Sequence, residues 1–144
     1  HIGLKLLAEK WQEAINLILD PRKDESDQRA VEARKLWKDT GDAKSAQEMF
    51  PYRFTAERQI LSHIAKNGGN DFLGAICAIN RELRMMYVHA VQSYIWNKMA
   101  TLRFKVYGKQ VVLGDLVIST DSEEVVLVDE ENIKMYNYTD IVLP

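Results

Sequence analysis

The segment from Arg81 to about Val106 constrains the fold most, because it contains neither glycine nor proline. Apolar residues recur along it every three or four positions, the spacing of a helix with one packed face. Glycine and proline are the residues least favourable inside helices, and the next of either is Gly108. The segment therefore predicts one long helix over residues 81–106.

Five further helices are predicted before this segment, each bounded by a capping or helix-breaking residue. They comprise Leu4–Leu19, a helix containing Val31–Trp37 that stops at Thr40-Gly41, a short helix after Asp42, one that starts at Thr55 and ends at Lys66–Asn70, and Asp71–Ile79. Thr55 and Asp71 are expected to be N-caps. Phe50-Pro51-Tyr52 separates two of the helices, since proline disfavours helical backbone at the residue before it.

The pattern changes after the long segment to short β-branched runs separated by turn residues. These runs are Val111–Ile118, Val125–Val128 and Ile141–Leu143. Valine and isoleucine in such short runs are typical of strands. We therefore expect an α-dominated α+β fold with about six helices followed by a small antiparallel β patch, in a single domain covering residues 1–144.

Composition limits the class of protein. Hydrophobic residues make up 47% and charged residues 28% of the 144 residues, which is typical of a globular protein. No apolar run approaches the roughly 18 residues that cross a bilayer, so no membrane partner is expected. A net charge of −2 argues against a dedicated nucleic-acid-binding module, and any contact with a nucleic acid must be local.

Residues able to carry metal or redox chemistry are sparse. The single cysteine, Cys77, sits in an apolar run and is expected to pack as a small hydrophobe, which favours a reducing compartment. His63 and His89 are far apart, and no cluster has the spacing of metal ligands, so no metal is expected. The aspartates considered as catalytic groups all have ordinary capping or turn explanations: Asp20, Asp42, Asp71, Asp115 and Asp140.

A stripe of neutral polar side chains lies along the predicted long helix. At about 100° per residue, one face carries His89, Gln92, Ser93, Trp96 and Asn97. The opposite arc is expected to pack in the core: Tyr87, Val88, Val91, Tyr94, Ile95, Met99 and Leu102. Neutral donors and acceptors suit a half-buried surface that has hydrogen-bonding partners. The partner is either a neighbouring structural element or, if the stripe lines a site, another domain or a ligand.

Basic residues also recur along this helix, at Arg81, Arg84, Lys98, Arg103 and Lys105. Such residues could contact phosphates, which supply much of the affinity for nucleic acids. Ordinary solvated charge explains them equally well, and both interpretations stay open.

The pattern Arg-x-x-x-x-His-x-x-Gln-Ser-x-x-Trp-Asn, met here by residues 84–97, resembles the signature helix of the TruD family of RNA pseudouridine synthases. Other segments resemble family landmarks: Trp11, Leu17–Arg22, Glu57–Leu61, Asn80, Gly114–Val117 and Tyr138–Pro144. The resemblance thus covers almost the whole chain. Met-Tyr before His89 and Trp96 before Asn97 look more like the eukaryotic branch, which implies a nuclear or cytoplasmic location.

The resemblance implies a function as well as a fold. Family members isomerise uridine to pseudouridine in RNA without metal or cofactor, through attack by an aspartate. That aspartate belongs to a Gly-Thr-Lys-Asp-Arg-like motif, which this sequence lacks. The chain would thus be the TRUD insertion domain of a larger enzyme, inactive alone, with the missing catalytic domain and RNA (tRNA, and mRNA among others) as partners.

The resemblance also assigns the residues of the signature helix a role. In such an enzyme the insertion domain forms one wall of the RNA-binding cleft. The residues expected to line that cleft or bind RNA are Arg84, His89, Gln92, Ser93, Trp96 and Asn97. The rival hypothesis is a non-catalytic helical module that uses the same polar helix to dock a protein partner.

Overall fold

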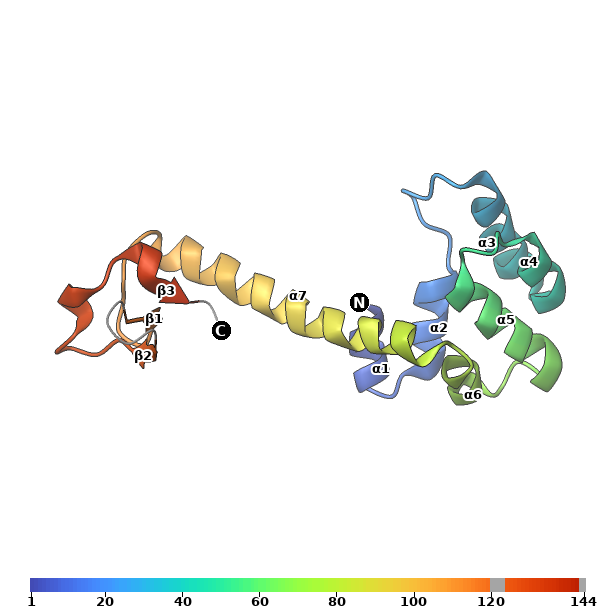
Figure 1. Ribbon diagram of the computed structural model, residues 1–144. Helices are drawn as coiled ribbons and strands as arrows, with labels where there is room; N and C mark the ends of the chain where they lie inside the picture. Colours follow the sequence, from blue (N-terminus) through green and yellow to red (C-terminus); the bar gives the residue numbers. More distant parts are fainter. Residues whose placement is uncertain (120–123, 143–144) are drawn as a thin grey trace. The chain divides into compact units, whose positions relative to one another are not determined.

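The computed structural model describes residues 1–119 and 124–142, which form seven α-helices and a three-stranded antiparallel sheet (Figure 1). The α-helices are α1 (Ile2–Leu7), α2 (Trp11–Leu19), α3 (Gln28–Thr40), α4 (Ala43–Met49), α5 (Thr55–Asn67), α6 (Phe72–Cys77) and α7 (Arg81–Tyr107). The strands are β1 (Leu116–Ile118), β2 (Val125–Leu127) and β3 (Ile141–Val142), and the 3₁₀ turns are η1 (Ile133–Met135) and η2 (Tyr138–Asp140). The predicted α-dominated α+β class is confirmed.

The chain divides into two compact units, His1–Val91 and Gln92–Pro144. The first contains α1 to α6 and the beginning of α7. The second contains the remainder of α7 and the sheet. Helix α7 agrees with the long helix predicted over residues 81–106, because nothing between its ends interrupts helical backbone.

Aspartate side chains start three of the helices. Asp27 accepts a hydrogen bond from the backbone N–H of Ala30, Asp42 accepts from those of Lys44 and Ser45, and Asp71 accepts from that of Gly74. These bonds satisfy N–H groups that have no partner within the helix. At the other end of α3, Gly41 has a φ of 68°, the left-handed conformation expected of a helix stop.

Two local predictions for the helices are wrong. The predicted Leu4–Leu19 helix is two helices, because Glu9 takes a φ of 56° and the N–H of Lys10 donates back to the carbonyl of Lys5 at 2.9 Å. No glycine marks this left-handed turn, so the apolar periodicity passes over it. Thr55 is the first residue of α5 rather than its cap, since Phe54 holds the cap position and provides no side-chain hydrogen bond.

The core of the first unit gathers one apolar face from each of its helices. The largest fully buried apolar side chains there are Ile18, Leu19, Phe50, Ile60, Leu61 and Ile79. Arg34 is buried among them, and its Nη2 donates to Glu57 Oε1 at 2.7 Å. Its Nη1 donates to the carbonyl of Ile18, and its guanidinium lies 5.4 Å from the centre of the Phe50 ring. A charge buried at this depth requires such partners.

The sheet of the second unit has the order β2-β1-β3, with Val117 opposite Val126 on one side and Ile141 on the other. Val117 and the neighbouring Val128 are buried. The predicted run Val111–Ile118 contributes only β1, because Asp115 accepts a hydrogen bond from the N–H of Val112 and bends the preceding residues into a loop. The Ile141–Leu143 prediction is met by β3, with Leu143 outside the described residues.

Cys77 was expected to pack as a small hydrophobe, and this prediction is wrong. Its side chain is exposed at the end of α6, whereas Ala75, Ile76 and Ile79 carry the buried face of that segment. Composition of the run could not distinguish the two sides of so short a helix. Within the described ranges, none of the helices has the length and apolar content needed to span a membrane.

Candidate functional site

Helix α7 carries all six residues predicted to bind RNA. Gln92, Ser93, Trp96 and Asn97 occupy one side of its second-unit portion at helical spacing, and all four are exposed. His89, also exposed, and Arg84, half-buried, belong to the first-unit portion of the helix. Arg84 donates from Nη1 to the carbonyl of Cys77 at 3.0 Å, which ties it to the end of α6.

The polar stripe is more exposed than expected. Neutral donors and acceptors predicted a half-buried face, but within residues 1–119 and 124–142 the side chains of Gln92, Ser93 and Asn97 make no hydrogen bond. Water can satisfy these groups, so their exposure carries no energetic penalty. Their role in lining a cleft stays a prediction.

The apolar arc of α7 is packed over part of its length only. Val91 is buried and Tyr87 and Val88 are half-buried, as predicted. In α1, Gly3 approaches this part of α7 so closely that a Cβ atom would clash with the Tyr87 carbonyl oxygen and lie 2.5 Å from Val91 Cγ2. Burial raises the pKa of the Tyr87 hydroxyl, and the negative charge of Glu57 adds to the increase.

The prediction of core packing is wrong for the rest of the arc: the exposed side chains are Tyr94, Ile95, Met99 and Leu102, with 41%, 53%, 59% and 55% of their surface exposed. Helical periodicity identifies which side of a helix is apolar. It does not specify how many turns of that side meet a neighbour, because the neighbour is distant in sequence.

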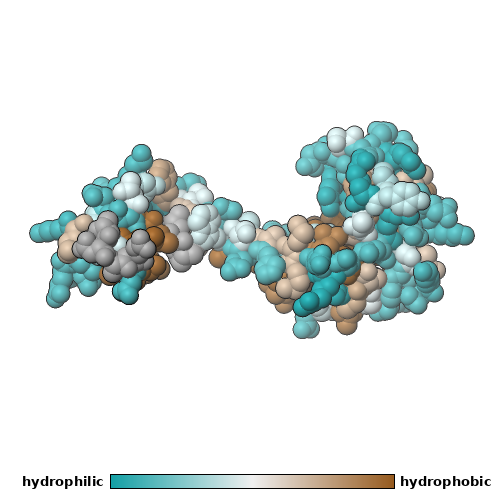
Figure 2. Space-filling view, viewed as in Figure 1, coloured by the Kyte–Doolittle hydropathy of each residue, from teal (hydrophilic) through white to brown (hydrophobic). Residues whose placement is uncertain are grey.

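A shallow groove runs along this exposed part of α7. Its lining combines apolar and basic side chains: Tyr94, Asn97, Lys98, Met99, Thr101, Leu102 and Lys105. The Lys98 ammonium lies 5.3 Å from the centre of the Tyr94 ring. Figure 2 shows hydrophobic surface, in brown, on both units. The sequence did not indicate this groove, because helical periodicity predicted that most of its apolar lining residues pack in the core.

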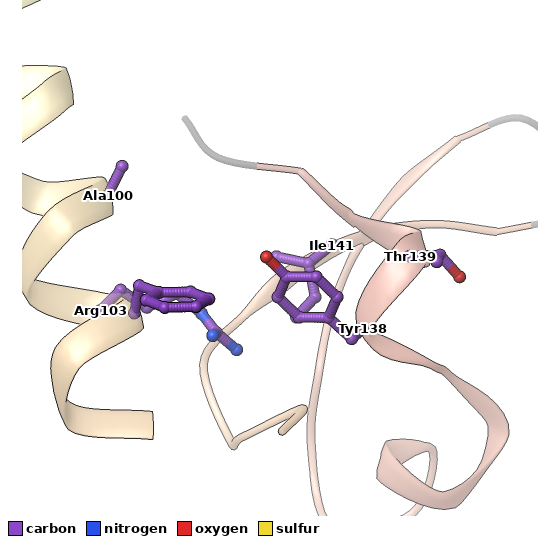
Figure 3. Close-up of a pocket in the computed structure, with 6 residues that line it drawn as sticks. Ala100, Arg103, Tyr138, Thr139 and Ile141 are labelled. Atoms are coloured by element: carbon purple, nitrogen blue, oxygen red, sulfur yellow. The ribbon is translucent and has the colours of Figure 1, made fainter. Parts of the chain in front are cut away.

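Arg103, one of the basic residues considered for phosphate contact, is instead held within the second unit. Its Nε and Nη2 donate to the two carboxylate oxygens of Asp115 at 3.0 and 2.6 Å. Nη1 donates to the Gly108 carbonyl and Nη2 to the Gln110 carbonyl. Figure 3 shows Arg103 extending from α7 toward Tyr138, whereas Thr139 points away. This Arg103–Asp115 clamp fastens the end of α7 to the loop before β1.

The clamp perturbs both of its ionisable groups. Burial by itself would raise the pKa of Asp115, but hydrogen bonds from Arg103 and the Val112 N–H outweigh it and hold that pKa below its usual value. The hydrogen bond to Asp115 in turn raises the pKa of Arg103. A paired arginine of this kind stabilises structure and has few donors left for a ligand.

One further pair of titratable residues has a structural role. His63 Nε2 lies 2.8 Å from Asp71 Oδ2, beside the cap of α6. The bond from the Gly74 N–H, followed by that from His63, lowers the pKa of Asp71. In the part of the chain that the structure describes, no three His, Cys, Asp or Glu residues come together in a way that could hold a metal ion.

The family model for tRNA pseudouridine synthase D (TruD) matches residues 1–140. The chain therefore belongs to the TruD family, as its resemblance to the signature helix indicated.

Relatives with assigned names agree with this membership. The chain is 43% identical over 122 residues to multisubstrate pseudouridine synthase 7 of Schizosaccharomyces pombe, covering 84% of this chain and 18% of that protein. It is 33% identical over 144 residues to the human pseudouridylate synthase 7 homolog, covering 100% of this chain and 22% of that protein. The chain thus spans about a fifth of the length of these relatives.

A solved structure supports the fold. The crystal structure of a Methanosarcina mazei protein assigned to tRNA pseudouridine synthase D (TruD) superposes with a TM-score of 0.72 at 25% sequence identity. The match covers 93% of this chain and 32% of that one.

Proposed function

We propose that this chain is the insertion-domain part of an RNA pseudouridine synthase and forms one wall of the cleft that holds the RNA. Membership of the TruD family over residues 1–140 is the observation that carries the proposal. The substrates would be tRNA and other RNAs, mRNA among them, since one relative is named a multisubstrate pseudouridine synthase. By the same inference the enzyme acts in the nucleus or cytoplasm and needs no metal or cofactor.

The exposed surface of α7 supports a partner within the same polypeptide. Over the second-unit portion of the helix, apolar side chains such as Ile95, Met99 and Leu102 stand in solvent beside the polar stripe. A long helix gains most of its stability from packing of its apolar face, so a cover for this face is expected. We assign that cover to a catalytic domain, which would lie in the roughly four fifths of the relatives' length that this chain does not match.

Release of tritium from tRNA labelled at uridine C5 tests the proposal. The full-length protein should release tritium, because formation of the new carbon–carbon bond displaces the C5 hydrogen. The 144-residue chain should release none, since the attacking carboxylate lies outside it.

Two controls complete this test. A full-length variant in which the aspartate of the Gly-Thr-Lys-Asp-Arg-like motif is changed to alanine should release no more tritium than the background. No release by the intact full-length protein would instead favour a non-catalytic interaction module, and turnover by the short chain would show that one of its own carboxylates is catalytic.

A further inference from the structure

The turn between α4 and α5 displays one aromatic ring in solvent. Tyr52 is 87% exposed, more than any other large hydrophobic side chain among the described residues. The turn itself is anchored: Phe50 is buried, and the Phe54 N–H donates to the Pro51 carbonyl at 3.0 Å. Proline restricts the backbone further at the start of the turn. Tyr52 is thus presented outward by a backbone that is held in place.

Arg58 supports one face of this ring. Its guanidinium carbon lies 4.7 Å from the centre of the Tyr52 ring. The guanidinium is itself fixed, because Nη1 donates to the carbonyls of Gln47 and Phe50 at 2.6 and 2.7 Å. The cation therefore restrains the ring without burying it. The opposite face of Tyr52 remains open.

The charge beneath the ring is not neutralised. Across residues 1–119 and 124–142, Arg58 forms no ion pair with a carboxylate, and its hydrogen bonds go to backbone carbonyls. Arg53, next to Tyr52 in the turn, behaves differently because it pairs with Asp27. The turn therefore combines an open aromatic face with a fixed, unpaired positive charge.

We propose that Tyr52 and Arg58 form a stacking platform for a nucleobase of single-stranded RNA. Every base has a π face that can stack on an aromatic side chain, and a cation beside the stack attracts the neighbouring phosphates. Because Tyr52 is already restrained, little conformational freedom is lost on binding. A single aromatic ring on an unpaired arginine, Arg58, offers little apolar area to a protein partner and suits RNA better.

This platform rests on the proposed function and gives it a second point of contact with RNA, outside α7. In the sequence, Phe50-Pro51-Tyr52 indicated only a break between helices. The one signal available was an aromatic residue between a proline and an arginine, which alone does not distinguish a stacking residue from a core residue.

Fluorescence anisotropy with a fluorescein-labelled oligouridine of about 12 nucleotides tests the platform on the full 144-residue chain. Tyr52→Ala should weaken binding about 5- to 140-fold, the range found when a stacking aromatic is removed. Tyr52→Phe should bind like the parent chain, whereas Tyr52→Leu should be as weak as Tyr52→Ala, since leucine keeps apolar surface but cannot stack. Arg58→Gln should weaken binding and reduce its salt dependence by about one phosphate contact.

Two controls separate stacking from other effects. Leu73→Ala removes another exposed apolar side chain, 50% exposed on α6, and should leave the Kd unchanged. With an abasic oligomer of the same length, the parent chain and Tyr52→Ala should bind equally, because no base is present to stack. Circular dichroism melting should give all Tyr52 variants the Tm of the parent, since the ring is exposed.

Equal binding of oligouridine by the parent chain and Tyr52→Ala would overturn the platform, as would parent-like binding by Tyr52→Leu or no binding by the parent. The tritium assay on the full-length protein separates this result from the proposed function. If the full-length protein releases tritium but Tyr52→Ala does not change oligouridine binding, only the platform is refuted. Tyr52-dependent binding by a full-length protein that releases no tritium supports the platform and refutes the synthase.

Discussion

At the scale of single residues, Arg34 and Glu57 form an ion pair inside the first unit. The Arg34 side chain is fully buried and that of Glu57 is 9% exposed. A second carboxylate oxygen, Glu25 Oε2, lies 3.9 Å from Arg34 Nε, so within the described residues Glu57 is the carboxylate that hydrogen-bonds to Arg34. Removing the hydrogen-bonded partner of a buried charge costs more than the pair itself contributes. Arg34 Nε lacks a hydrogen-bond partner within the described part of the chain, so the hydrogen bonds of Nη1 and Nη2 must stabilise the buried charge.

We predict that Glu57→Ala lowers the free energy of unfolding of the chain by about 3–5 kcal/mol, measured by urea denaturation. Lys38→Ala is the matched control. It breaks an ion pair with Asp20 whose side chains are 60% and 53% exposed, and it should cost about 0–1 kcal/mol. Similar losses in the free energy of unfolding for the two variants would mean that burial does not increase the contribution of the Arg34–Glu57 pair to stability.

The Arg103–Asp115 clamp predicts a dependence of stability on pH. Because the folded-state pKa of Asp115 is lowered, its contribution to stability is present above the unfolded pKa of about 3.9 and is lost as the pH falls through the folded value. Asp115→Asn should therefore reduce the free energy of unfolding at neutral pH by about 1–3 kcal/mol. The difference between parent and variant should shrink below about pH 4. A constant difference across this range would show that the clamp contributes no pH-dependent stability.

At the scale of elements, α7 is a helix whose apolar arc is covered over its first turns and exposed afterwards. Close approach of α1 at Gly3 provides the cover at Tyr87 and Val91. Beyond Val91, the arc has no buried residue on the helix. Mutations along one face of the same helix should therefore have different consequences in the short chain and in the full-length protein.

We predict that Ile95→Ala changes the free energy of unfolding of the 144-residue chain by less than about 1 kcal/mol, because Ile95 is 53% exposed. In the full-length protein the same variant should cost about 2–5 kcal/mol if the proposed catalytic domain covers the arc. Val91→Ala is the control. Val91 is buried in the chain itself, so this substitution should destabilise both the 144-residue chain and the full-length protein. A small loss for Ile95→Ala in the full-length protein would contradict the proposed cover.

The polar stripe of α7 predicts an effect on function. Asn97→Ala in the full-length protein should lower kcat/KM for tRNA by the equivalent of about 1–3 kcal/mol and leave the Tm of the 144-residue chain unchanged. Lys109→Ala, a change at an exposed residue just beyond α7, serves as the control. If Asn97→Ala instead lowered the Tm and left turnover intact, the residue would be structural.

At the scale of the whole molecule, this chain spans only part of the length of its relatives. It matches the family over residues 1–140 and spans 22% of its human relative. The proposed catalytic domain would cover the exposed apolar side chains of α7 from Ile95 to Leu102. The platform at Tyr52 does not depend on a covering domain, because Arg58 restrains its ring within the same unit.

The sequence alone predicted several features: the extent of α7, the α-dominated class, the cap at Asp71 and the family. Periodicity, capping and motif spacing are properties of neighbouring residues. The tertiary structure decided that Arg34 is buried, that Tyr52 and Ile95 are exposed and that Arg103 is clamped. Each of these depends on which distant elements meet, and contact between distant elements is set by packing of the whole unit rather than by any local pattern.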